Sequence, residues 1–419
     1  MTSVWDNFGK LVTLKITFPQ NSTAKKATIF GNGNNQVPVT INCHVKDKDN
    51  ADITLTKDEL LKVVSLVNYS TGEKIAFDGG RSDIKWWNYS ETESDFSTPL
   101  GYGLTEVNKV SDVLDSDDYV TLYVSATDIL AETEIDIAVQ IDVPGVGPFN
   151  TTAEGTETKN GPDGKEGSVF KAPSFVHVLA RLPVDYSRLD NLHLQQSPWD
   201  PVSNQNFTVH DYIIDGAYFE KDNAKLYRRT VKVTPQEPML KFVEVKFSYK
   251  DYYDYDTWTD AVVWHHDKQV GMEVVDKIDA NTTAQIPFVA IGGFGVSVGN
   301  PDYDTYLWFT PDAKHADSSN DPLNYHVNGF FHLIDSEWQY RTDLDFITNL
   351  EISSKTEVAL TGYKIHTPTG KNTSIHGWDD VYQPVTFNVT DNYGNKGSFK
   401  VAFFHDKSSY ESVGDVVLE

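Results

Sequence analysis

The feature that most constrains the fold is a pattern that occurs three times along this chain of 419 residues. Each occurrence opens with a short proline-headed strand, and well downstream an alternating strand ends on an aspartate. The proline-headed segments are residues 36–41, 171–176 and 285–290. The alternating segments are residues 120–128, 243–251 and 385–391. Because repeated segments are expected to fold alike, the pattern predicts three stacked β-domains.

The last two occurrences agree beyond the aspartate. Asp251 and Asp391 both lead through a polar turn into a returning strand, which leaves through His-Asp-Lys at 266–268 and 405–407. The first occurrence is looser, since Asp128 leads through a loop into residues 135–143, where apolar and polar residues alternate. Such alternation is typical of an antiparallel strand with one buried face. The alternative is chance, because any β protein repeats strand, turn and strand.

Charge and composition narrow the classes of partner. The formal net charge of −26 repels phosphate backbones and anionic lipid surfaces, so we expect no nucleic-acid partner. No segment approaches the roughly 18 apolar residues of a spanning helix, so we expect no membrane insertion. The N-terminal residues do not resemble a secretory signal. A cytoplasmic location, and a released or cell-surface location reached without a signal peptide, both stay open.

Local signals suggest the domain limits. Residues 155–168 have no apolar residue except Pro162 and predict a linker. A second boundary near residue 271 completes a division into domains 1–154, 169–270 and 271–419. The sequence Thr56-Lys57-Asp58-Glu59 is a capping box and predicts the one helix, from Lys57 to about Val67. Residues 12–18 predict a terminal strand able to add to the sheet of a neighbouring molecule.

One hairpin resembles a known family. In residues 385–401 an alternating strand ends in Thr-Asp, an Asn/Gly-rich turn follows, and a closing strand returns. This arrangement is similar to the last hairpin of bacterial immunoglobulin-like repeats, which are β-sandwich modules of adhesins, filaments and cell-surface proteins. The resemblance implies tandem immunoglobulin-like sandwiches with loop insertions, and together with the capped helix it predicts an all-β fold with one short helix. The capped helix and the unequal spacing of the three patterns depart from a plain module.

Signatures of catalysis are scarce. The chain contains no His-Glu-x-x-His and no phosphate-binding loop, and its Gly-x-Ser-x-Gly match falls at residues 295–299. The glycine-rich run 292–299 is followed by no helical pattern and is interpreted as a bulged or tightly packed strand. Carboxylates are abundant, so a glycoside hydrolase or another hydrolase on a β scaffold stays an alternative, although nothing singles out one catalytic pair. We expect no catalytic residues and no cofactor.

Calcium is the one ion that the sequence suggests. Carboxylate oxygens are the ligands that calcium prefers, and acidic side chains gather after the second alternating strand. A solvated acidic turn is the alternative interpretation of the same residues. The candidate ligands are Asp251, Asp254 and Asp256.

Aromatic side chains beside polar ones are the best binding candidates. Flat aromatic rings stack on sugars, and exposed Trp and Tyr are also typical of protein–protein contacts. Adjacent residues on a strand face opposite sides, so one of two neighbouring Trp is expected in the core. The candidates are Trp86, Trp87, Tyr252, Tyr253, Tyr255 and Trp258.

The sequence therefore favours a non-catalytic structural or adhesive protein that serves as a subunit of a self-associating assembly. Its expected partner is a second copy of the chain, in a homo-oligomer or filament, or a glycan or protein surface. Carbohydrate binding through the aromatic candidates is the second hypothesis.

Overall fold

The fold is described from a computed structural model. It describes residues 3–102, 119–154, 174–202, 207–213, 217–220, 225–248, 264–265, 268–269, 272–275, 288–297, 302–311, 323–332, 339–348, 358–368, 385–403 and 415–419. The chain divides into two compact units. Unit 1 holds Met1–Val184 with Asn392–Asn395, and unit 2 holds Asp185–Asp391 with Lys396–Glu419.

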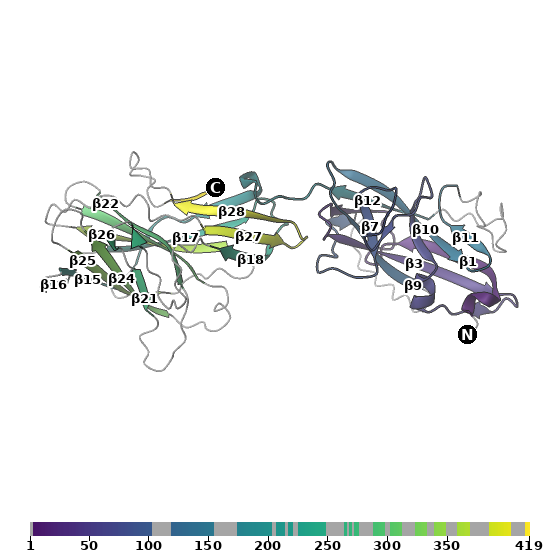
Figure 1. The fold of residues 1–419 in the computed structure, drawn as a ribbon, viewed down its shortest axis with the longest axis horizontal. Coiled ribbons are helices and arrows are strands. Elements are labelled where there is room, and N and C mark those ends of the chain that lie inside the picture. Colours follow the sequence, from purple (N-terminus) through teal and green to yellow (C-terminus); the bar gives the residue numbers. More distant parts are fainter. Residues whose placement is uncertain are drawn as a thin grey trace, which may run out of the picture. The chain divides into compact units, whose positions relative to one another are not determined.

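Unit 1 contains two sheets, which can be followed in Figure 1. We call the first the β1 sheet. Most of its strands are antiparallel, and only β6 and β7 run parallel. Its order is β1 (Phe8–Thr17), β3 (Gln36–Asp47), β9 (Tyr119–Ala126), β7 (Trp87–Ser90) and β6 (Ala76–Phe77), with β4 (Asp52–Ile53) beside β3.

The second sheet of unit 1, the β10 sheet, is built around one long strand. Its order is β11 (Gly147–Asn150), β10 (Thr133–Val143), β12 (Val176–Arg181), β2 (Lys26–Phe30) and β8 (Gly101–Tyr102), with β5 (Val64–Asn68) also on β10. The strand predicted at residues 135–143 is confirmed as part of β10. The pairing of β12 with β2 is parallel.

Strands β11 and β12 share one edge of β10. β5 pairs with Ile137–Ile141, a stretch that overlaps the partners of both β11 and β12. A strand has two edges, so β5 occupies one edge and β11 and β12 follow each other along the other. Where they meet, the Thr151 hydroxyl donates to the Ser174 carbonyl at 2.6 Å, and the Ser174 amide donates to the Thr151 carbonyl at 3.2 Å.

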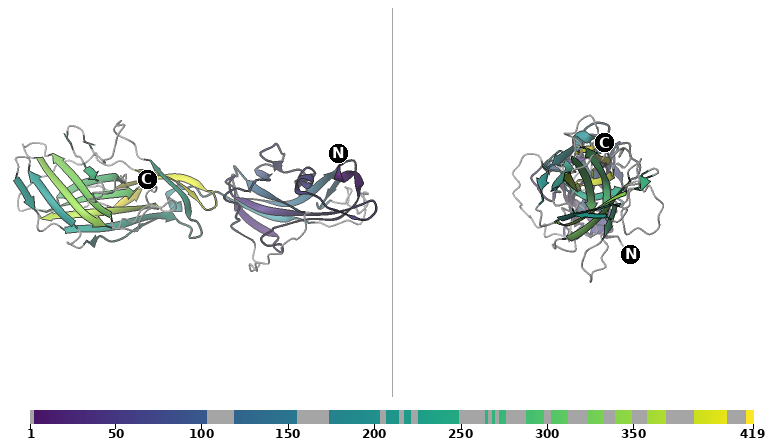
Figure 2. Two further views of the ribbon diagram at one scale, coloured as in Figure 1. Left: turned by 90° about the horizontal axis from the view of Figure 1, so that it is seen from below. Right: turned by 90° about the vertical axis from the view of Figure 1, so that its left-hand side faces the viewer.

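The core of unit 1 lies between its two sheets (Figure 2). Alternate residues of β1, β3 and β10 point into it, among them Leu14, Ile41 and Val139, which are fully buried. Each such side chain stabilises the fold by roughly 1.5–3 kcal/mol. The ring of Phe8 on β1 meets that of Phe149 on β11 edge-on, with their centroids 5.6 Å apart.

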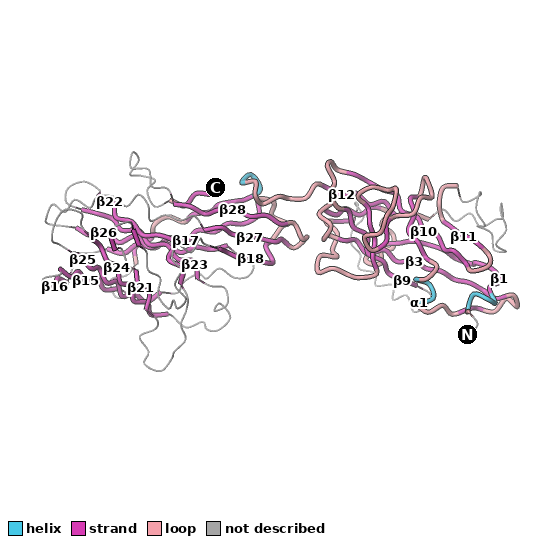
Figure 3. Tube along the Cα trace, viewed as in Figure 1, coloured by secondary structure: helices cyan, strands magenta, loops and turns pink. Residues whose placement is uncertain are grey.

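Helix is rare in the described chain (Figure 3). Two 3-10 helices, Val4–Asn7 and Leu189–Asn191, accompany α1 (Lys57–Leu61). The predicted capping box is confirmed, because Thr56 Oγ1 accepts from the Glu59 amide at 3.3 Å and Glu59 Oε2 accepts from the Thr56 amide at 2.9 Å. The predicted end near Val67 is wrong: residues 64–68 form β5, where β-branched side chains pair with β10.

Unit 2 contains three larger sheets, and every pairing in them is antiparallel. The β17 sheet has the order β13 (Leu192–Gln196), β17 (Lys225–Pro235), β26 (Val358–Pro368), β23 (Asp302–Pro311) and β22 (Phe288–Ser297), with β14 (Asp200–Pro201) beside β17. The β25 sheet has the order β16 (Ala217–Glu220), β15 (Phe207–Ile213), β25 (Gln339–Thr348), β24 (Leu323–His332) and β21 (Met272–Val275).

The third sheet of unit 2, the β27 sheet, contains the hairpin noted in the sequence. Its order is β18 (Phe242–Ser248), β27 (Val385–Asp391), β28 (Lys396–Phe403) and β29 (Val416–Leu418). Inside it, the rings of Phe387 and Phe399 stack across the hairpin with centroids 5.8 Å apart. A separate two-stranded pair joins β19 (Trp264–His265) to β20 (Lys268–Gln269).

The three occurrences of the sequence pattern do not lie in equivalent places. The first supplies β3 and β9, which are neighbours in one sheet. The second reaches β12 of unit 1 only at Val176 and supplies β18 of unit 2, and the third reaches β22 and supplies β27, which belong to different sheets. Moreover, β18 and β27 pair with each other. The chain is all-β, as predicted, but the expectation that this pattern marks three copies of one module is wrong.

The two units also differ from the predicted division into domains 1–154, 169–270 and 271–419. Strand β12, which follows the predicted linker 155–168, pairs with β10 and β2 and so belongs to unit 1. Strand β18 pairs with β27, which joins the predicted second and third domains in one sheet. The predicted linker lies outside the described residues. The terminal strand predicted at 12–18 forms part of β1, paired with β3 of its own sheet.

Candidate functional site

Trp86 and Trp87 have opposite environments. Trp87 opens β7 opposite Ala126 and is 4% exposed, whereas Trp86 is 41% exposed. Trp86 has a φ of 71°, in the left-handed region that bulky residues rarely adopt. Its carbonyl accepts the Thr127 amide at 2.9 Å, and the next residue, Asp128, has a φ of 54°. One residue with positive φ therefore accepts this hydrogen bond at the end of the β7–β9 ladder, and a second follows the donor.

The other predicted binding and metal residues lie outside the described part of the chain. These are Tyr252, Tyr253, Tyr255, Trp258, Asp251, Asp254 and Asp256. Within the residues that are described, no group of three or more His, Cys, Asp or Glu side chains is arranged to hold a metal ion. The calcium site stays a prediction.

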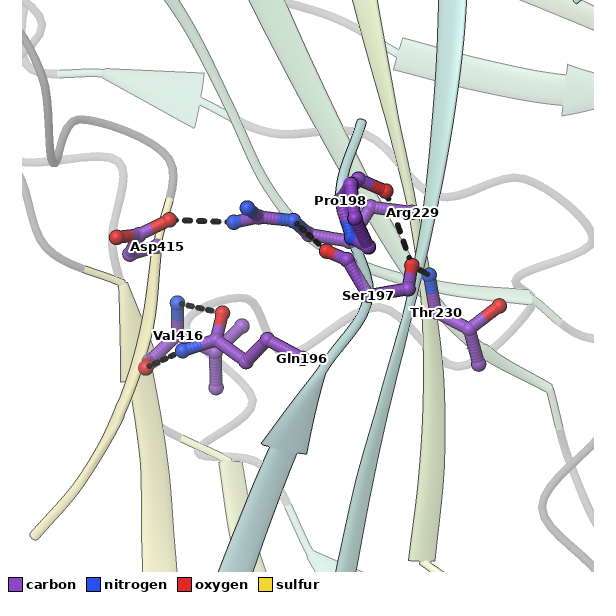
Figure 4. A network of polar contacts seen from close by, with 7 residues as sticks. All are labelled: Gln196, Ser197, Pro198, Arg229, Thr230, Asp415 and Val416. Atoms are coloured by element: carbon purple, nitrogen blue, oxygen red, sulfur yellow. Dashed lines mark hydrogen bonds and ion pairs between the residues drawn. The ribbon is translucent and has the colours of Figure 1, made fainter. Parts of the chain in front are cut away.

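A cluster of polar contacts in unit 2 holds the C-terminal strand in place (Figure 4). We call it the C-terminal clip and define it by Gln196, Ser197, Arg229, Asp415 and Val416. The Gln196 side-chain amide donates to the Val416 carbonyl at 2.9 Å and accepts from the Val416 amide at 3.0 Å. One side chain thereby makes the two hydrogen bonds that a neighbouring strand would make with Val416.

Arg229 completes the clip from β17. Its guanidinium donates to Asp415 and, through Nε, to the Ser197 carbonyl at 2.8 Å. It also lies over the Trp199 ring, with its central carbon 4.8 Å from the ring centroid. The Arg229 side chain is 13% exposed and that of Asp415 is 38% exposed, so the guanidinium is largely shielded from solvent while the carboxylate is partly exposed.

A buried tyrosine and a buried carboxylate meet in unit 2. The Tyr186 hydroxyl donates to Asp391 Oδ2 at 2.8 Å, and both residues are completely buried. Burial, and then the Asp391 carboxylate, raise the pKa of Tyr186 far above its ordinary value, so the hydroxyl stays a donor. The Tyr186 ring contacts Phe242 edge-on at 5.2 Å. This pair locks the end of β27 to the start of unit 2.

The turn Asn392–Asn395 is built into unit 1. Asn32 Nδ2 donates to the Tyr393 carbonyl at 3.0 Å and to Asn395 Oδ1 at 2.8 Å, and the Tyr393 ring meets that of Phe30 at 5.8 Å. Gly394 has a φ of 78°, and a Cβ there would lie 2.7 Å from Asn34 Cβ. Glycine is therefore required at this position for two independent reasons.

Sequence reasoning found Trp86 and Asp391 but missed the clip. Gln196 and Val416 are 220 positions apart, and Arg229 and Asp415 are 186 positions apart. No local motif or spacing signals such pairs. The aspartate at the end of the alternating strand did mark Asp391, but nothing in the sequence pointed to Tyr186 as its partner.

Comparisons with known proteins add no relative: no family model, curated protein or solved structure matches the chain. In the described residues, no helix is both long and apolar enough to cross a membrane.

Proposed function

We propose that the chain is a non-catalytic structural or adhesive protein, acting as a subunit of a self-associating assembly. The main support is that polar side chains in the described residues hydrogen-bond to one another across long distances in the sequence. Asp391 with Tyr186, and Arg229 with Asp415, connect distant strands through buried or half-buried hydrogen bonds. Groups engaged in this way stiffen a β framework, which is what a scaffolding subunit requires.

Measurement of particle mass tests the proposal. Static light scattering on the intact chain, over a range of concentrations and with and without calcium, should give masses above the 47.1 kDa of one chain. A mass that stays at 47.1 kDa throughout would contradict self-association. A mass that rises only when calcium is added would instead favour the acidic residues near Asp251 as the trigger.

Carbohydrate binding is a second candidate because Trp86 is both exposed and strained. A bulky residue kept in an unfavourable backbone conformation suggests a role beyond stability. A glycan array is the direct test, with Trp86→Ala as the variant expected to lose any signal. Binding that is unchanged by Trp86→Ala, or an array without hits, would remove this candidate.

We propose that the β27–β28 hairpin belongs to an immunoglobulin-like module. Support comes from the turn after Asp391, which joins two antiparallel strands in the register Thr390↔Lys396 to Val385↔Val401. A crystal structure of the intact chain would test this, because the module requires the β27 sheet to pack against a second sheet as a sandwich.

A further inference from the structure

The edges of the described sheets are mostly guarded against pairing with other chains. In β1, two register irregularities interrupt the strand, which also carries Lys10 and Lys15. In β18, a bulge follows Phe242, and Glu244 pairs with Lys246 at 2.6 Å. In β29, the clip already occupies the backbone of Val416. Bulges, charges and covering side chains are the usual means of blocking edge-to-edge association.

The remaining edge strands are short, with one exception. β4, β6, β8, β11, β14, β16 and β21 have two to four residues each, and β5 and β13 have five. β22 has ten residues and lies at the end of the β17 sheet, where β23 is its only partner among the described strands (Figure 1). After an irregularity between Ala290 and Gly292, it pairs with β23 without interruption from Gly292 to Ser297. We call residues 292–297 the β22 edge.

The β22 edge differs from the others in charge. Residues 280–301, which include all of β22, contain no Asp, Glu, Lys, Arg or His, although the chain as a whole carries a net charge of −26. Two copies of so acidic a chain repel each other wherever carboxylates meet. An uncharged strand at a sheet edge is where two copies approach at the lowest electrostatic cost.

Glycine at Gly292, Gly293 and Gly295 is a second, independent indication. Glycine weakens a strand, and its presence inside one often marks a place where another backbone approaches closely. An antiparallel strand edge also complements itself, because the same row of donors and acceptors meets its own copy across a two-fold axis.

We propose that the β22 edge pairs antiparallel with the β22 edge of a second copy of the chain, joining the two β17 sheets into one continuous sheet. This inference rests on the proposed self-association and specifies where it occurs. The pairing is symmetric and therefore closes as a dimer, so higher assemblies would need a further contact.

Cysteine scanning on the intact chain locates the contact. The only native cysteine, Cys43, is buried, so its thiol is shielded from an oxidant added to the folded chain. Single variants from Gly292→Cys to Ser297→Cys are oxidised and separated on non-reducing gels, and the wild-type mass is measured by light scattering. We expect a wild-type mass of twice 47.1 kDa and a disulfide-linked dimer that peaks at one position of the scan, next to the two-fold axis. Val12→Cys, on the exposed β1 edge, is the matched control and should give only background crosslinking.

The outcomes separate the two proposals. The wild-type chain can double in mass while no position in 292–297 crosslinks more than Val12→Cys. In that case the proposed β22 contact is wrong, although self-association stands. If the mass never exceeds 47.1 kDa, self-association itself fails, and the β22 contact fails with it. Hydrogen exchange on the unaltered chain avoids any folding defect of the variants. We expect the protection of amides 292–297 from exchange to rise with protein concentration. If the mass doubles while this protection stays constant, the β22 contact is wrong.

Discussion

The Tyr186 hydroxyl donates a 2.8 Å hydrogen bond to the Asp391 carboxylate across 205 positions of sequence. Neither residue is exposed to solvent. A buried acceptor that loses its donor keeps the full desolvation cost. Removing the Tyr186 hydroxyl should therefore cost more stability than removing a donor at the protein surface.

Tyr186→Phe should lower the free energy of unfolding by about 1–3 kcal/mol, because it leaves Asp391 buried without this donor. Urea unfolding followed by circular dichroism measures the change. The double variant with Asp391→Asn completes a mutant cycle, and an additive result would show that the two residues are not coupled.

The same pair predicts a loss of stability at alkaline pH. The pKa of Tyr186 is raised in the folded chain above the ordinary 10.0. The stability that protonated Tyr186 contributes is therefore complete below pH 10 and declines as the pH rises above that value. Unfolding free energies measured from pH 8 to 11 should fall more steeply for the wild type than for Tyr186→Phe. Parallel curves would mean that another tyrosine is responsible, such as Tyr102, whose pKa burial raises to about 12.

Gln196→Glu should release the C-terminal strand. The carboxylate cannot donate to the Val416 carbonyl and brings a negative charge against it, at a cost of about 1–3 kcal/mol. Faster hydrogen exchange at residues 416–418 is the expected result. Gln195→Glu adds the same charge one position earlier, on an exposed side chain, and should leave exchange there unchanged.

Gly394→Ala should destabilise the chain more than Gly72→Ala. Both glycines have a φ above 70°, so both substitutions carry a similar backbone cost of about 1 kcal/mol. Only at Gly394 would the new Cβ collide with Asn34 and Phe96, whereas nothing lies within 4 Å at Gly72. Thermal unfolding of the two variants measures the difference in stability. Equal losses of stability would show that the turn around Gly394 shifts to accommodate the Cβ at no energetic cost.

Thr56→Ala should lower stability by about 1 kcal/mol, since it removes the oxygen that caps α1. The hydrogen bonds from Thr56 lower the pKa of Glu59 below 4.5. The Glu59 contribution is therefore present above pH 4.5 and is lost as the pH falls through the lowered value. The difference between the wild type and Thr56→Ala should narrow in acid, by the part that the Thr56 hydroxyl contributes when it donates to the Glu59 carboxylate. The exposed neighbour Thr54→Ala serves as the control, and a similar loss there would exclude the cap as the cause.

The sequence predicted individual elements better than their assembly. Alternation at 135–143 identified β10, and the Thr56–Glu59 spacing identified the cap, because both signals lie within a few residues. The helix was predicted too long because Val64 and Val67 fit a helical spacing equally well, and pairing with β10 decides their state. The predicted domain limits differ from the two compact units where a strand pairs with one far back in the sequence, as β12 does with β10. Contacts such as Gln196 with Val416 depend wholly on that long-range pairing.

Because β11 and β12 share one edge of β10, the chain between residues 154 and 174 is a suitable place to insert a foreign sequence. The hydrogen bonds between Thr151 and Ser174 fix both ends of the intervening chain on the same strand. When the two ends of a connection are fixed, each doubling of its length costs only about 0.6 kcal/mol in closure entropy. A reporter domain or an affinity tag placed there would leave the sheet pairing of unit 1 intact, so this position offers a route to label the protein without altering either terminus.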